Sequence, residues 1–375
     1  MRKATLEKCD QLRFTIERSD DVDSMRSLWV SLEFKASPTF FISWYWISSW
    51  LRIIGPDVFV CKVYSHECLV ALGLFVNTSS TRHKILNVEQ LRLQSVGDES
   101  KDQIWPEYNN MLIAKGFEKE VYEGLIHFLS QNTEISWDEL LIGPIDKKVL
   151  TLITSDPCQS VERWRAPSYG VDLASIRLGG QCYLDSLSKN TRYQIRRAIR
   201  KYGKDLSLNV AQSKSQALSY FEKIAPLHLR RWEASSGFNN QYFTRFHQDL
   251  IERCFDEGVI ELVELNVDGE GIGYLYNFVY NNKVYFYLSG INLDSDVRQK
   301  PGLVLHALCI QYHLEQGAEL YDFLGGDARY KQSLGKQTGE LFVVSFQKSV
   351  VKLRIEQFAR GLKHYIERNT LGNDV

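Results

Sequence analysis

The chain has 375 residues, of which 44% are hydrophobic and 24% are charged. This composition is typical of a folded protein of about two domains, and it excludes wholesale disorder and collagen-like or low-complexity structure. Basic residues number 45 and acidic residues 46, so the formal net charge is −1. That balance excludes a polycation built to coat nucleic acid over its whole surface.

The seven cysteines and the N-terminal segment indicate the compartment. The number of cysteines is odd and no two of them form a C-x-x-C pair, so we expect neither a disulfide framework nor a metal site. The N-terminal sequence MRKATLEKCDQLRF lacks the apolar core of a secretory signal. These features together predict free thiols and a cytoplasmic protein.

The first half of the chain alternates predicted strands and helices. Its most hydrophobic segment, FFISWYWISSWLRIIG at residues 40–55, is too short to span a bilayer and contains Arg52. Its tryptophans and isoleucines recur at helical spacing, which fits a core helix or a segment lying on a membrane surface. Strands are predicted at 57–64, 68–77, 108–114 and 138–142, and a helix at 117–131.

A domain boundary is predicted at 154–170, where Pro157, Pro167 and Gly170 interrupt every periodic pattern. Beyond it, three strands in succession are followed by a helical crossover and a further strand, an order that produces a mixed sheet. Strands are predicted at 206–211, 259–267, 272–280, 283–291, 319–324 and 341–347. Helices are predicted at 184–203, 214–236, 240–257, 302–316, 327–334 and from 351 onward. The strands 283–291 and 319–324 should lie side by side and parallel.

The first candidate site is the loop that opens the helix at 302. Gln299-x-x-Gly302 places unpaired backbone N–H groups and a residue without Cβ at a helix start, where phosphate oxygens bind well. Arg298 and Lys300 add positive charge there. A Pro-Gly pair before a helix is also an ordinary cap, so both interpretations stay open.

The second candidate is the basic helix, which we define as residues 189–204. It holds seven basic residues and no acidic one, and Arg192, Arg196 and Arg200 share one face. Like charges at this spacing disfavour an isolated helix. A solvated or internally paired face, a phosphate ligand and RNA would each explain the run, although few aromatic residues interleave it, which disfavours single-stranded nucleic acid.

Histidines and a tyrosine supply candidate proton carriers. His228 lies four residues from Trp232, and Arg231 beside it would hold the imidazole neutral, as a base must be. A packed histidine is the competing interpretation. Tyr330 follows a strand that ends in Gly325-Gly326, and it is either a core aromatic or a phenol donor. No G-x-S-x-G, Walker A or H-E-x-x-H motif is present.

The element order and the loop at 299–304 together resemble the GNAT acyl-CoA N-acyltransferase superfamily, although Val304 stands where that family usually has Gly or Ala. The segments PEYNNMLI, YLDSLSKNTRYQIRRAIRKYG, LHLRRW and YDFLGGDARYK are similar to the CelD-like, cellulose-biosynthesis-type branch, which is related to FemABX peptidyltransferases. The resemblance implies an α/β (α+β) protein of tandem GNAT-like domains, each a mixed central sheet flanked by helices. Residues 1–165 would form a degenerate domain and residues 166–375 the acyltransferase domain.

The resemblance implies an acyl-CoA-dependent N-acyltransferase that modifies a primary amine on a small molecule or sugar, in cell-envelope or exopolysaccharide biosynthesis. It needs no metal, no DNA and no stable membrane insertion. A FemABX-like transferase using aminoacyl-tRNA and a non-catalytic binding module are the alternatives.

The resemblance also assigns residue roles. The residues expected at coenzyme A are Leu288, Ser289, Gly290, Arg298, Gln299, Lys300, Gly302 and Leu303. Those expected at an anionic acceptor or the 3′-phosphate are Arg192, Arg196, Arg200 and Trp232. His228 is the first candidate base, followed by Asp322 and His247, and Tyr330 would protonate the leaving thiolate.

Overall fold

The computed structural model describes residues 12–19, 21–292, 299–351 and 353. The first half contains β1 (Arg13–Ser19), α1 (Val22–Glu33), α2 (Trp44–Ile54), β2 (Val58–Ser65), β3 (Cys68–Arg82), β4 (Leu86–Leu93), β5 (Leu112–Ile113), α3 (Glu118–Gln131), β6 (Glu139–Asp146), α4 (Lys147–Leu152) and β7 (Gln159–Asp172). The second half contains α5 (Leu173–Leu178), α6 (Tyr183–Ser186), α7 (Lys189–Tyr202), β8 (Leu206–Val210), α8 (Lys214–Trp232), α9 (Gln241–Cys254), β9 (Ile260–Val267), β10 (Glu270–Tyr280), β11 (Lys283–Ile291), α10 (Pro301–Glu315), β12 (Leu320–Gly325), α11 (Arg329–Leu334) and β13 (Lys336–Gln347).

One mixed sheet runs through both halves of the described chain, in the order β1-β2-β3-β4-β6-β13-β7-β12-β11-β10-β9-β8, with β5 beside β3. Each half contains one parallel pair, β4 with β6 in the first and β11 with β12 in the second. The expected parallel pairing of 283–291 with 319–324 is thereby confirmed. Each half of the described chain is thus a mixed sheet flanked by helices.

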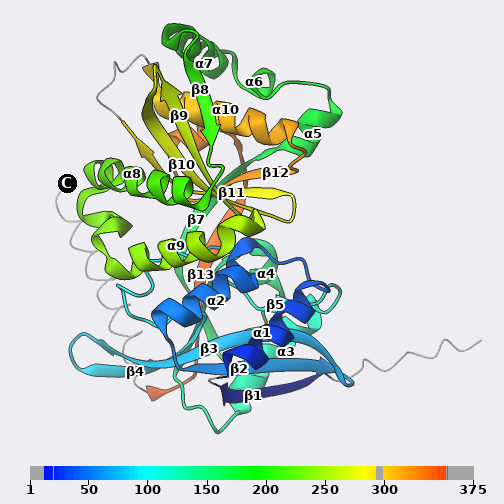
Figure 1. Ribbon diagram of the computed structural model, residues 1–375. Helices are drawn as coiled ribbons and strands as arrows, with labels where there is room; N and C mark the ends of the chain where they lie inside the picture. The colour runs from blue at the N-terminus through cyan, green and yellow to red at the C-terminus, as the bar shows by residue number, and fades with distance from the viewer. Residues whose placement is uncertain (1–11, 20, 293–298, 352, 354–375) are drawn as a thin grey trace, which may run out of the picture.

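The two halves exchange their last strands. β7 follows β6 and α4 in the chain, yet it lies between β13 and β12. β13 follows β12 and α11, yet it lies between β6 and β7. Figure 1 shows both strands running between the lower, N-terminal half and the upper, C-terminal half. The boundary proposed at 165/166 therefore falls within a strand that pairs with the second half.

The segment at 40–55 forms a core helix in the structure. Ser43 caps α2 by accepting from the Trp46 N–H, and Gly55 ends it in the left-handed conformation. Trp46 and Trp50 are almost fully buried, and the Trp46 ring meets Phe246 of α9 at a centroid distance of 4.7 Å. In the described part of the chain, no helix combines the length and apolarity needed to cross a bilayer.

Among the predicted elements that differ in extent, two have a clear local cause. The predicted strand at 108–114 shrinks to Leu112–Ile113, because Tyr108 adopts a positive φ of 51° that no strand permits. The predicted helix at 184–203 divides into α6 and α7, since Leu187 is extended and Ser188 caps a new helix. By contrast, α8 continues through Pro226. The helix predicted from 351 lies almost entirely outside the described residues.

Candidate functional site

The parallel strands β11 and β12 part within the second half. Their pairing joins Lys283–Tyr285 to Leu320–Asp322 and goes no further. β11 continues to Ile291, so its edge from Phe286 onward has no ladder contact with β12. An open strand edge of this kind offers backbone N–H and C=O groups to a ligand.

Leu288, Ser289 and Gly290, which were expected at the cofactor, lie on this open part of β11. Gly290 also has a packing role, because a Cβ at this position would lie 2.8 Å from the Ile224 Cα of α8. The glycine therefore lets α8 pass directly over the strand. The Leu288 side chain is buried in the core, so at this position only the backbone suits ligand binding.

The helix α10 begins beside the end of β11. Lys300 takes the left-handed conformation, with φ of 48°, and Pro301 occupies the first helical position. The Lys300 side chain makes no capping hydrogen bond at this helix start, and the first-turn N–H groups of Gly302 and Leu303 have no acceptor within the helix. A Cβ at Gly302 would meet Ile291 at 3.8 Å and nothing closer.

The other predicted residues of this loop that the structure describes lie at or beside the helix start. Gln299 and Lys300 are half-buried beside the helix start, and Arg298 lies outside the described residues. Val304, which departs from the family pattern, is 0% exposed and packs in the core. Its side chain therefore points away from the ligand side of this turn and does not cover the free N–H groups.

Tyr330 stands where the two strands separate. Its ring meets Phe286 and Phe323 at centroid distances of 6.3 and 6.1 Å, and these are the first residues of β11 and β12 beyond the last paired position. It also stacks on His306 at 5.3 Å, one turn after Gly302 on α10. Burial raises the pKa of Tyr330 well above 10, so its hydroxyl remains a proton donor at neutral pH.

A segment of the first half reaches this point, and the sequence analysis assigned no role to its side chains. Glu107 Oε2 accepts a hydrogen bond of 2.6 Å from the Gly325 N–H at the end of β12. Tyr108 donates to Asp322 Oδ2 at 2.7 Å. The site at the end of β12 is therefore built from both halves.

Charges in this cluster modify one another. Burial raises the pKa of Glu107 to about 7, against the lowering effects of the Gly325 N–H and of Lys331. Burial lowers the pKa of Lys331, whose ammonium donates to the carbonyl oxygens of Leu324 and Gly325. Burial also raises the pKa of Asp322. Lys331 adjoins Tyr330 in the sequence, and this proximity was the signal that could have revealed it.

The two candidate histidines occupy different surroundings. His228 is held by a contact of 2.8 Å between its Nδ1 and Ser236 Oγ, and burial together with Arg231 lowers its pKa to about 4. The imidazole is neutral at pH 7, as expected, but it is a weak base. His247 is fully buried among aromatic rings, with Nε2 3.1 Å from the Tyr287 hydroxyl. Burial lowers its pKa, and its place fits a packed core histidine.

The basic helix is partly neutralised within the fold. Asp185 forms ion pairs with Arg196 at 3.0 Å and with Arg192 at 3.6 Å. Arg200 is exposed on the same helix, α7. Trp232, at the end of α8, is half-exposed and lies under the Arg231 guanidinium at 5.2 Å. Internal pairing thus accounts for two of the three arginines on the shared face.

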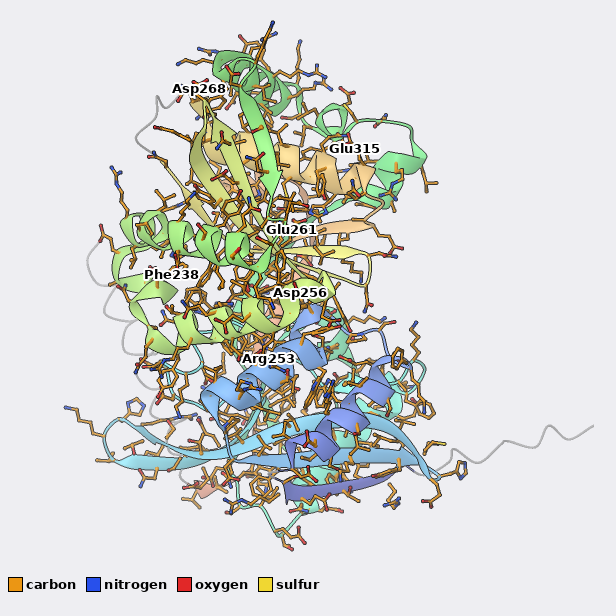
Figure 2. The ribbon with its side chains drawn as sticks, viewed as in Figure 1. Phe238, Arg253, Asp256, Glu261, Asp268 and Glu315 are labelled. Atoms are coloured by element: carbon orange, nitrogen blue, oxygen red, sulfur yellow. The ribbon has the colours of Figure 1, made fainter. Side chains whose placement is uncertain are left out.

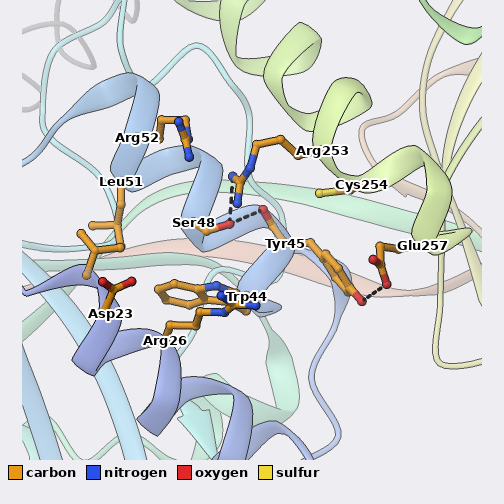
Figure 3. A pocket seen from close by; sticks show the side chains of 11 residues that line it. Asp23, Arg26, Trp44, Tyr45, Ser48, Leu51, Arg52, Arg253, Cys254 and Glu257 are labelled. Carbon is orange, nitrogen blue, oxygen red and sulfur yellow. Dashed lines mark hydrogen bonds between the residues drawn. The ribbon is translucent and has the colours of Figure 1, made fainter. Parts of the chain in front are cut away.

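A separate pocket of about 460 Å³ lies between α1 and α2 of the first half and α9 of the second. Figure 3 shows Tyr45 directed at Glu257 and Arg253 directed at Ser48 across it, with contacts of 3.5 and 3.3 Å. None of the predicted site residues lines this pocket.

One family of known proteins matches the second half of the chain. Residues 189–332 match the family described as acetyltransferase (GNAT) domain. This part of the chain is therefore similar to a GNAT acetyltransferase domain. The match includes the open part of β11, the start of α10 and Tyr330. No curated protein matches the chain.

Solved structures resemble nearly the whole chain. The crystal structure of FemX superposes with a TM-score of 0.57 at 9% identity, covering 91% of this chain and 99% of FemX. A conserved protein of unknown function from Bacteroides thetaiotaomicron VPI-5482 gives 0.54 at 11% identity, covering 89% and 100%. L-PGS from Bacillus licheniformis gives 0.52 at 12% identity, covering 89% and 96%. Identities this low show a shared fold alone.

Proposed function

We propose that the protein is an acyl-CoA-dependent N-acyltransferase that moves an acyl group from a coenzyme A thioester to a primary amine. One observation carries this proposal: Tyr330 stands where β11 and β12 part and stacks on the residue one turn beyond Gly302. The phenol that would protonate the leaving thiolate and the helix start that would bind phosphate are thereby joined through the first turns of α10. The GNAT domain match supports the same chemistry.

The cofactor side of the reaction follows from the open strand edge and the helix start. The backbone of Leu288, Ser289 and Gly290 would bond the pantetheine amides. The Gly302 and Leu303 N–H groups, with Lys300 nearby and Gln299 before the helix, would bind the pyrophosphate, and the α10 dipole favours that negative charge. The bound thioester supplies the electrophilic carbonyl, and Tyr330 donates a proton to the departing thiolate.

The acceptor amine must lose a proton before or during its attack. His228 is neutral, but its pKa of about 4 makes it a poor acceptor of that proton. Glu107, with a pKa of about 7, is better matched to a base that works near neutrality. We therefore assign the role of base to Glu107 before His228, and a positioning role to Asp322, whose oxygens are held by Tyr108 and by the Leu324 N–H.

A ligand panel tests the proposal. Acetyl-, malonyl- and long-chain acyl-CoA are added to the purified full chain, and the melting temperature is measured by thermal shift. A ligand at a hundred times its Kd stabilises the fold by about 2.7 kcal/mol. The variant Gly302→Glu should abolish this shift, because its bulk and charge occupy the helix start. No stabilisation of the wild type by any acyl-CoA would contradict the proposal.

An aminoacyl-tRNA-dependent transferase of the FemABX kind is the second candidate. The full-length likeness to FemX and the exposed Arg200 on α7 favour it. It predicts binding of RNA that weakens steeply with salt, and no stabilisation by coenzyme A thioesters. We also propose, on the sequence resemblance, that the protein belongs to the CelD-like branch and acts in cell-envelope or exopolysaccharide synthesis.

A further inference from the structure

We propose that Glu261, Cys309, His313 and Asn277 form a binding site for one zinc ion inside the second half. The carboxylate, thiol and imidazole ligand atoms of the first three lie within 4.8 Å of one another. Glu261 comes from β9, and the other two lie four residues apart on α10, so one helix face presents both. Figure 2 shows Glu261 near the centre of the molecule.

The distances between the ligand atoms are close to those around a bound zinc ion, so binding requires only small movements of the side chains. Zinc bonds sulfur at about 2.3 Å and nitrogen or oxygen at about 2.0–2.2 Å, which places neighbouring ligand atoms roughly 3.3–3.8 Å apart. His313 Nε2 and Glu261 Oε1 are already 2.9 Å apart. The cluster therefore needs movements of about 1 Å, which side-chain rotation supplies.

Asn277 provides an independent observation. Its side chain is fully buried, and its Nδ2 donates to Glu261 Oε1 at 2.9 Å and to Cys309 Sγ at 3.5 Å. Its Oδ1 has no hydrogen-bond partner among the described residues. A buried amide oxygen left unpaired is costly. A half-turn of the amide would bring Oδ1 among the ligand atoms and complete a four-coordinate site.

The donor set selects the ion. A thiolate with imidazole and carboxylate suits zinc, whereas magnesium and calcium prefer oxygen ligands. Burial raises the pKa of the Cys309 thiol, so a bound ion must displace that proton to solvent, whereas His313 would bind through Nε2 as the neutral imidazole that carries its proton on Nδ1. The ion would tie β9 to α10, the helix whose first turn is the proposed cofactor site.

This site could not be predicted from the sequence, because its residues are divided between β9, β10 and α10. Cys309 and His313 form a spacing of one helical turn, but Glu261 and Asn277 precede them by more than 30 residues. The hydrogen bond between His313 and Glu261 also exists without an ion. Metal content, rather than geometry alone, therefore has to decide.

Zinc alone is the probe. The full chain is stripped with a chelator, zinc is added, and bound metal is measured by elemental analysis after gel filtration. We expect about one zinc per chain and a melting temperature that rises by roughly 5 °C at zinc a hundred times above its Kd. Cobalt in place of zinc should give a thiolate-to-cobalt charge-transfer band in the near ultraviolet.

Cys309→Ser should lose the cobalt band and most of the bound zinc. Cys254→Ser, a buried cysteine of α9 outside the cluster, should keep both. Less than about a tenth of a zinc per wild-type chain, or a wild-type cobalt complex without the thiolate band, would overturn the proposal even where Cys309→Ser fails to fold. Unchanged binding in Cys309→Ser would overturn it as well.

Discussion

Tyr330 and Glu107 meet the end of β12 from opposite halves of the chain. Burial is the main cause of the raised pKa of Tyr330, and Arg231 lowers this pKa while the charge of Glu107 raises it further, so the two residues are electrostatically linked. A proton donor and a proton acceptor beside one opening are the arrangement that acyl transfer to an amine requires. In the proposed mechanism the two residues have separate roles, which single substitutions can distinguish.

Tyr330→Phe should lower kcat by roughly 10- to 100-fold while the Kd for acyl-CoA stays constant, since general acids contribute up to about 10⁴-fold. The effect should lie low in that range, because a thiolate whose conjugate acid has a pKa of about 8.5 leaves readily without help. Steady-state kinetics and calorimetry measure the two quantities. Tyr312→Phe, on the half-exposed side of α10, is the matched control. A parallel loss of affinity would make Tyr330 a packing residue.

Glu107→Gln should remove a step from the pH profile of kcat. In the wild type the rate should rise as pH passes through about 7, the pKa to which burial raises this carboxyl. The glutamine variant keeps the acceptor for the Gly325 N–H but has no such step, and Glu107→Asp should restore part of it. Activity that rises through pH 7 unchanged in Glu107→Gln would exclude Glu107 as the base.

At the scale of single elements, the sequence predicted those helices and strands whose structure depends on local residue patterns. The strands of the meander, the crossover helix α10 and the parallel β11–β12 pair follow from periodicity and from turn residues such as Asn281-Asn282. The prediction of a strand from residue 108 was wrong because the backbone of the loop at 105–110 is determined by contacts with residues far away in the sequence. Tyr108 is held by Asp322, 214 residues away, so no local signal places it at the site.

The basic helix gives a prediction at the same scale. Arg200→Ala should leave the free energy of unfolding within about 0.5 kcal/mol of the wild type, because an exposed side chain contributes little. Arg196→Ala should cost roughly 0.2–1 kcal/mol, since it breaks the pair with Asp185. Urea denaturation measures both. If Arg200→Ala also leaves every acyl-CoA and RNA affinity unchanged, α7 is a solvated face.

Across the whole molecule, a buried carboxylate joins the strands that the two halves exchange. Glu139 of β6 pairs with Arg82 of β3 and Arg163 of β7, and it accepts from Gln347 of β13. Burial would raise its pKa, but the arginines outweigh burial and lower it to about 2. Removing the charge takes a buried carboxylate away from both arginines.

Glu139→Gln should therefore lower the free energy of unfolding at pH 7 by roughly 3–5 kcal/mol. The sign with pH follows from the lowered pKa: the contribution of Glu139 is complete above about 4.5 and disappears as pH falls through about 2. Urea unfolding at several pH values should show the variant and the wild type converging in acid. A constant difference down to pH 2 would contradict this assignment.

The exchange of β7 and β13 also decides how the chain can be divided. A cut after Asp156 leaves residues 1–156 without β13 along β6. It also exposes an aromatic cluster in which Phe40 stacks on Phe278 at 4.2 Å and Trp46 meets Phe246. Exposed strand edges and apolar faces favour aggregation. Expressed singly, neither 1–156 nor 157–375 should give a cooperative thermal transition, whereas the two expressed together should copurify and melt as one unit. A cooperative transition in isolated 157–375 would show that the second half folds without β6 along β13, and the shared seam would then be a docking contact between two independent domains.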